Sequence, residues 1–142
     1  MTPAEITAYV MALPVEDVRR LSATDVMGWR KSDCIGASCG YPTHYADDVL
    51  ATRPPTQLIS EWRPDEDRNQ SRMVDIRAID LVGGVDFILA VGAVLKTCLL
   101  SGDWLTADGE VQILALLGMT PDQETRAALV AHMIHRQEVT NG

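Results

Sequence analysis

The sequence predicts an α+β fold in which a small antiparallel sheet of two or three strands is packed between α-helices. The sheet is expected from three short apolar runs, at 85–91, 93–100 and 111–117, and from the turn signal Asp108-Gly109 before the last run. The helices are expected from stretches whose apolar residues recur every three or four positions. Each such helix carries one apolar face, and only these runs are hydrophobic enough to receive it. Periodicity alone leaves a buried helix over 85–100 open as an alternative.

The N-terminal region is predicted to form two helices. Thr2 is a suitable N-cap with Pro3 in the first turn, and Glu5 stands in the capping-box position. Pro14 interrupts this first helix, and Gly28 is placed to end the second. The apolar residues that define the two helix faces are Ile6, Val10 and Leu13, then Val15, Val18, Leu21 and Val26.

From residue 31 to about residue 60 the chain loses its periodicity, because glycines and prolines punctuate it and the apolar residues are scattered. We therefore expect one domain over 1–142 with a long loop or insertion at about 31–60, and loops of this length are often functional. Helical patterns return over 65–79, where the first turn is acidic, and over 121–135, which Thr120 caps. The domain can be completed by dimerisation if the sheet has too few strands of its own.

The apolar runs also predict where the fold does not tolerate a charge. Leu89 and Ile113 lie in the middle of two of these runs. An aspartate at either position is expected to prevent folding, because a buried carboxylate without a partner costs several kcal/mol against a total stability of about 5–15 kcal/mol. The same change at Thr43, in the irregular segment, is expected to be nearly silent.

Composition and charge limit the classes of partner. The formal net charge of −8 repels a phosphate backbone, which disfavours general nucleic-acid binding. Residues 81–100 are mostly apolar, but Asp86 and Lys96 make a membrane span costly. An odd number of cysteines, three, and a start without a signal-peptide pattern predict a cytoplasmic protein.

Three short segments, in order along the chain, carry a resemblance to a known family. Segment 21–29 closes on Met-Gly-Trp, segment 61–67 is an extended entry into an acidic helix start, and segment 119–131 is an Ala-rich closing helix. Together they resemble the phage ABA sandwich domain family, small proteins encoded by phages and prophages. The resemblance implies a sheet sandwiched between helices, often in a dimer, and a host bacterium as the setting. It carries over no catalytic residue, because the family has no assigned activity.

The first candidate site is a ligand-binding group formed by Trp62, Arg63, Arg68 and Arg72. An aromatic face beside guanidinium groups is suited to stack a base and to hold a phosphate. A small phosphate-bearing ligand is therefore expected there. In the alternative, Trp62 packs on the sheet while the arginines pair with nearby carboxylates, namely Asp65, Glu66 and Asp75.

The second candidate is a metal site at Cys34, Cys39 and His44, which fall in one loop. Thiolates and imidazoles are the usual zinc ligands, so zinc is the one cofactor that this loop would bring. A closed zinc site needs a fourth ligand, which His132 or His135 can supply only through the tertiary fold. The alternative is a loop with two free thiols and a surface histidine.

No catalytic constellation is predicted. Trp29 and Trp104 are candidate interface residues, since a tryptophan suits a partly wet boundary. We therefore predict a non-enzymatic phage or prophage accessory protein, a homodimer, that binds a host protein. A first alternative is a protein that binds or sequesters a nucleotide or another small molecule in counter-defence. A second alternative is an enzyme that uses zinc or the pair His132 and His135.

Overall fold

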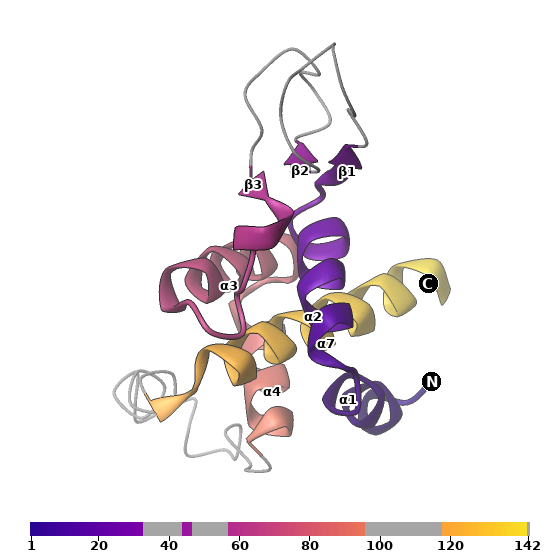
Figure 1. Cartoon of the computed structure of the whole chain (residues 1–142). Coiled ribbons are helices and arrows are strands. Elements are labelled where there is room, and N and C mark those ends of the chain that lie inside the picture. Colours follow the sequence, from indigo (N-terminus) through magenta and orange to yellow (C-terminus); the bar gives the residue numbers. More distant parts are fainter. Residues whose placement is uncertain (33–43, 47–56, 96–117, 142) are drawn as a thin grey trace.

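A computed structural model describes residues 1–32, 44–46, 57–95 and 118–141 of the chain, and these residues are mostly helical (Figure 1). No helix in this part of the chain is both long enough and apolar enough to cross a membrane. In chain order the helical elements are α1 (Pro3–Met11), α2 (Val15–Leu21), the π-helical turn η1 (Ser22–Val26), the 3₁₀ turn η2 (Ile59–Glu61), α3 (Arg68–Val82), α4 (Gly84–Val94) and α7 (Pro121–Asn141).

The core of the fold is built around α7, the helix that crosses the middle of the molecule in Figure 1. It makes its most extensive contacts with α3 and α4, and it also packs against α1 and η1. Residues 127–131 of α7 are all buried, and three of them are the alanines Ala127, Ala128 and Ala131. A stretch of helix that is apolar on all sides is suited to be enclosed by other helices. Its small side chains let those neighbours approach closely.

Local sequence signals place the helix starts. The capping box predicted at the first helix is confirmed, because Thr2 accepts a hydrogen bond from the Glu5 backbone N–H and the Glu5 carboxylate accepts one from the Thr2 N–H, both at 3.2 Å. Thr120 and Gln123 exchange the same pair of hydrogen bonds before α7, which confirms that start. The predicted start at residue 65 is displaced: α3 begins at Arg68, and Asp67 caps it.

A small antiparallel sheet stands at one end of the helical body rather than between helices (Figure 1). Its strands are β1 (Arg30–Ser32), β2 (His44–Ala46) and β3 (Gln57–Leu58), in the order β1-β2-β3. Tyr45 pairs with Lys31 on one side and with Gln57 on the other. The sheet therefore gathers the two ends of the segment 31–60, which the sequence predicts to be a long loop or insertion.

The predicted α+β sandwich is wrong. The apolar runs at 85–91 and 93–100 were expected to be strands, but residues 85–94 belong to the helix α4, as in the alternative that periodicity left open. The buried residues of this helix are Phe87, Ala90, Val91, Gly92 and Val94, which, Gly92 apart, cluster on one helical face, but their apolar neighbours hide that period in the sequence. The third run, 111–117, lies outside the described residues. The architecture implied by the phage family, an ABA sandwich, is therefore replaced by a mostly helical fold.

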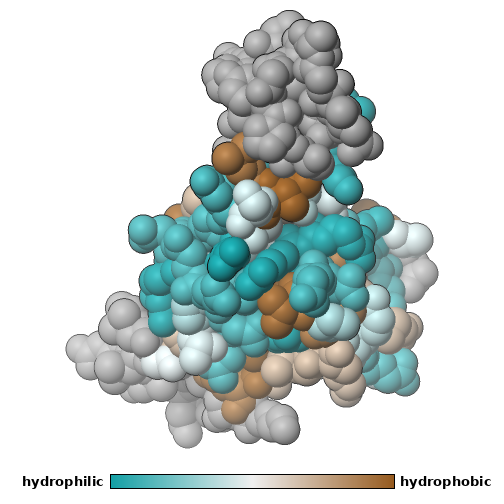
Figure 2. Space-filling model, viewed as in Figure 1, coloured by the Kyte–Doolittle hydropathy of each residue, from teal (hydrophilic) through white to brown (hydrophobic). Residues whose placement is uncertain are grey.

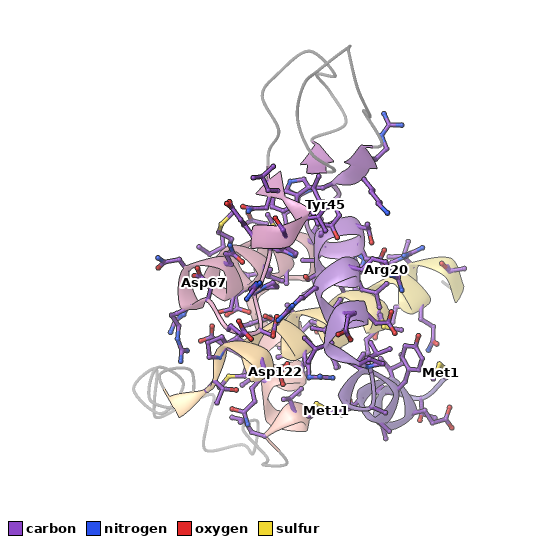
Figure 3. The ribbon with its side chains drawn as sticks, viewed as in Figure 1. Met1, Met11, Arg20, Tyr45, Asp67 and Asp122 are labelled. Atoms are coloured by element: carbon purple, nitrogen blue, oxygen red, sulfur yellow. The ribbon has the colours of Figure 1, made fainter. Side chains whose placement is uncertain are left out.

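A buried arginine fastens α1 to α7. The Arg126 Nη1 atom donates hydrogen bonds to the carbonyl oxygens of Val10 at 2.7 Å and Leu13 at 3.1 Å, where α1 ends. Its Nε atom donates to the Asp122 carboxylate one turn earlier, at 3.0 Å and 3.1 Å. Figure 3 shows Asp122 and Met11 close to this junction. The guanidinium thus adds a donor to carbonyl groups at the end of α1, among them that of Val10, which also accepts from the Leu13 N–H at 3.2 Å.

Candidate functional site

A cleft of about 360 Å³ lies where α2 meets the small sheet. We call it the Trp62 cleft. Figure 2 shows hydrophobic residues at the base of the strand region, above a helical body whose visible face is mostly hydrophilic. The side chains that line the cleft come from five elements and from the residue after η2: Glu16, Arg19, Arg20, Thr24, Lys31, Tyr45, Ile59 and Trp62.

Aromatic side chains form the floor of the Trp62 cleft. Trp62 and Tyr45 line it, and Trp29 connects them from behind, with ring centroids 4.8 Å from Trp62 and 6.1 Å from Tyr45. All three are buried. The Trp62 indole N–H donates to the Arg19 carbonyl oxygen at 3.0 Å and to the Ser22 hydroxyl at 3.1 Å, which fixes the ring against α2 and η1. The floor is therefore rigid and apolar.

Arg19 is held in place beneath the mouth of the cleft. Its Nε and Nη2 atoms donate to the two carboxylate oxygens of Asp65, at 2.7 Å and 3.0 Å, and Glu66 lies 3.4 Å away. The hydrogen bond with Asp65 is the main cause that raises the pKa of Arg19. A two-pronged pair of this kind fixes the guanidinium plane. Arg19 thus contributes charge and shape, but its Nε and Nη2 donors already face carboxylates.

Arg20 and Lys31 are the cations that remain adjustable. Both side chains are exposed, and among the described residues the Arg20 guanidinium pairs only with Asp17, at 3.3 Å on the solvent-exposed surface. Exposed pairs contribute about 0–1 kcal/mol, so a ligand anion can compete for this guanidinium. Burial raises the pKa of the Tyr45 phenol, and the Arg20 charge opposes that shift, which places the guanidinium within electrostatic reach of the aromatic floor. Figure 3 shows Arg20 on α2 below Tyr45.

Of the predicted ligand-binding residues, the structure places only Trp62 in the Trp62 cleft. Arg63 is exposed, lies 3.7 Å from Glu66, and donates to the Ser60 carbonyl oxygen at 3.4 Å. Arg68 and Arg72 project from α3 toward α7 and both approach Glu124, at 2.7 Å and 3.2 Å. The four residues therefore do not form one site.

Glu124 belongs to a buried carboxyl pair between α3 and α7, which we call the Asp75–Glu124 pair. Glu124 is fully buried and accepts a hydrogen bond from the Ser71 hydroxyl at 2.6 Å. The Asp75 carboxyl lies within electrostatic reach of Glu124, and its Oδ1 atom is buried without a hydrogen-bond partner among the described residues. Burial and the charge of Glu124 raise the pKa of Asp75 to about 8, and the charges of Arg72 and Arg68 oppose the shift. Asp75 therefore carries a proton at neutral pH.

The other predicted residues are scattered. His44 lies in β2, while Cys34, Cys39 and Trp104 lie outside the described residues. Trp29 is buried in the aromatic floor behind the Trp62 cleft. His132 is buried in α7, and burial lowers its pKa. Its Nδ1 atom has no hydrogen-bond partner in the part of the chain that the structure describes.

Sequence reasoning missed the cationic side of the Trp62 cleft. Arg19 and Arg20 appear in the sequence only as the polar face of a helix, and Lys31 and Tyr45 fall in the aperiodic segment. The one available signal was the pair Arg19-Arg20 in an acidic chain, three and four residues after Glu16. That signal does not say which aromatic side chains the arginines will meet.

Comparisons with protein-family models, with curated proteins and with solved structures found no match to this chain. The resemblance to the phage family thus rests on the three sequence segments alone. None of the side chains that line the Trp62 cleft in the described part of the chain is a histidine or a cysteine. Their joint chemistry is that of binding an anion beside an apolar surface.

Proposed function

We propose that the protein binds a small anion with a planar, apolar body, of the nucleoside monophosphate class, in the Trp62 cleft. One observation carries this proposal: in a chain of net charge −8, the cleft gathers Arg19, Arg20 and Lys31 around an aromatic floor. Sites for small ligands typically combine a mostly apolar wall with a few polar groups, in volumes of about 300–1,000 Å³. The cleft, at about 360 Å³, fits a ligand at the small end of that range.

The cleft's own groups divide the recognition between them. The planar body would lie against Tyr45 and Trp62, because aromatic side chains accept any flat apolar face. The anion would replace Asp17 as the partner of Arg20 and draw in Lys31, both charge-assisted contacts. Glu16, also in the lining, disfavours ligands with several negative charges. A monophosphate or a carboxylate is therefore favoured over a triphosphate.

We place this binding in the cytoplasm of a bacterium, where the phage resemblance would make it a means of sequestering a nucleotide. Titration calorimetry with adenosine monophosphate, phenyl phosphate, adenosine and inorganic phosphate tests it. The two aromatic phosphates are expected to bind more tightly than adenosine, which lacks the anion, or phosphate, which lacks the ring. Absence of binding by both aromatic phosphates would contradict the proposal.

Arg20→Ala is expected to weaken binding of adenosine monophosphate by about tenfold or more. A hydrogen bond to a charged group contributes about 1.5–3 kcal/mol, and about 1.4 kcal/mol corresponds to a factor of ten in Kd. Arg77→Ala is the matched control, because Arg77 is also exposed but lies on α3 outside the cleft. Equal losses in the two variants would mean that general charge, not the cleft, attracts the ligand.

Self-association is a second candidate, favoured by one face of α3. Met73, Ile76 and Ile79 are exposed there, and Ile76 has 62% of its surface accessible. Apolar side chains grouped on a surface often mark an interface, and a second copy presents the same face. We expect a dimer in solution that Ile76→Asp converts to a monomer, while Val139→Asp, at an exposed site on α7, does not. A monomeric mass for the natural chain at micromolar concentration would leave a host protein as the remaining macromolecular candidate.

A further inference from the structure

Three side chains with metal-binding atoms converge between α4 and α7, away from the Trp62 cleft. Asp86 lies in the first turn of α4, while His135 and Glu138 stand one turn apart on α7. One ligand atom from each of the three lies within 4.8 Å of the other two. We call this group the α4–α7 triad. Residues three apart on a helix share a face, so α7 presents the imidazole and the carboxylate together toward α4.

The donor set points to a class of ion. One imidazole with two carboxylates is typical of sites for Zn²⁺ and similar divalent transition metals, whereas Ca²⁺ and Mg²⁺ prefer oxygen ligands alone. Zinc bonds of about 2.0–2.2 Å would draw the donor atoms to within about 3–3.5 Å of one another. Asp86 and Glu138 are exposed and His135 is half-buried, so their side chains have room for this adjustment.

The charges around the triad favour a cation. Asp86 and Glu138 make no hydrogen bond or ion pair with the residues that the structure describes. Glu138 also lies near the C-terminal end of α7, where the helix dipole disfavours an anion and where the last turn holds no basic residue. The nearest basic neighbour in sequence, Arg136, reaches toward Asp25 on η1, at 3.8 Å. A bound cation would offset both carboxylates and the helix end.

A separate cavity of about 450 Å³ opens beside the triad, between α1, α4 and α7. Asp86 and Glu138 belong to its lining, and the rest is mostly apolar, including Leu89, Ala131 and Ile134. A metal with three protein ligands keeps at least one coordination position for water or for another donor. The position of the cavity would let a small apolar molecule with an oxygen donor reach that coordination position.

We propose that Asp86, His135 and Glu138 form a binding site for a divalent transition metal, of the Zn²⁺ class, with an open position toward this cavity. The site shares no lining residue with the Trp62 cleft. It does not depend on the function proposed there. Loss of metal would leave binding of adenosine monophosphate unchanged. A failure of the metal-site proposal is therefore distinguishable from a failure of the proposed function.

Calorimetric titration of the full chain with Zn²⁺ alone tests the site, with Mg²⁺ as the comparison ion. One equivalent of Zn²⁺ is expected to bind. Its affinity is expected to fall by at least about tenfold in each of three variants, His135→Ala, Asp86→Asn and Glu138→Gln. Asp80→Asn, an exposed carboxylate at the end of α3, is the control and should change nothing. Because all three triad side chains reach the surface, circular dichroism should show the variants folded as the natural chain is.

Two results would overturn the proposal. The first is that the chain binds no zinc ion whose affinity the triad variants lower. The second is that the chain binds Mg²⁺ more tightly than Zn²⁺. Cobalt substitution separates the triad from cysteine ligation, because a thiolate adds a charge-transfer absorption that nitrogen and oxygen ligands lack. A cobalt spectrum with that absorption, unaffected by His135→Ala, would assign the metal to cysteines and remove the triad.

Discussion

Phe87→Asp is expected to prevent folding, whereas Leu89→Asp, two residues further along α4, is expected to give a folded protein, contrary to the expectation from the apolar run. Phe87 is 1% exposed in the core around α7, and Leu89 is 50% exposed at the wall of the cavity between α1, α4 and α7. A carboxylate at position 87 would be buried without a partner, and the aromatic packing would be lost as well. These terms together approach the whole stability of a small domain, about 5–15 kcal/mol.

This pair of variants separates a helix from a strand. On a strand, residues 87 and 89 point to the same face, so the two aspartates would be equally harmful. On a helix they point in nearly opposite directions, as the burial of α4 requires. Circular dichroism and urea unfolding of the two purified proteins measure the difference. Failure of both variants to fold would favour the strand that the apolar run suggests, and soluble, cooperative Phe87→Asp would contradict the core described here.

Local signals in the sequence were sufficient for the starts of α1 and α7 but not for the start of α3 or for the fold class. Thr2 and Thr120 cap their helices through hydrogen bonds that span only three residues, so the pattern in the chain contains all the partners. The run at 85–94 has no such signal. Its buried and exposed positions are almost all apolar, so neither a period of two nor one of 3.6 stands out. The packing of this run against α7 decides between helix and strand, and that packing is a tertiary contact that the local sequence does not contain.

The same limit applies to the sites. Trp62 and its indole partner, the Arg19 carbonyl, are 43 residues apart, and Ser71 and Glu124 are 53 apart. The sequence indicated Trp62, Arg68 and Arg72 as candidate ligand-binding residues. Their partners in space, however, are not their nearest neighbours along the chain. The triad illustrates this further, because the i, i+3 pair His135 and Glu138 is visible in the sequence while Asp86 joins it only through the packing of α4 on α7.

The Asp75–Glu124 pair makes stability depend on pH in a direction opposite to that of most acidic residues. The pKa of Asp75 is about 8 in the folded state and about 3.9 in an unfolded chain. Between these values the folded protein keeps a proton that the unfolded chain releases. The free energy of unfolding is therefore expected to fall as pH rises from about 4 to 8, by up to about 1.4 kcal/mol per pH unit, and the effect levels off outside this window.

His132 acts in the other direction and has to be separated from this effect. Burial lowers its pKa, so the unfolded chain takes up a proton before the folded one does, and His132 lowers stability as pH falls below about 6.5. The net curve of the natural protein combines the two groups. A difference between two proteins that share His132 isolates the contribution of Asp75.

Asp75→Asn is expected to remove the Asp75 contribution and to make the protein more stable than the natural chain at pH 8 to 9. An asparagine is neutral at every pH, has nearly the same shape, and its amide is able to donate a hydrogen bond to Glu124 in place of the carboxyl proton. Urea unfolding at each pH unit from 5 to 9 measures the difference, with Asp80→Asn as an exposed control on the same helix. Parallel curves for Asp75→Asn and the natural protein would mean that Asp75 is ionised in the folded state. In that case Arg68 and Arg72, not a shared proton, would stabilise the two carboxylates.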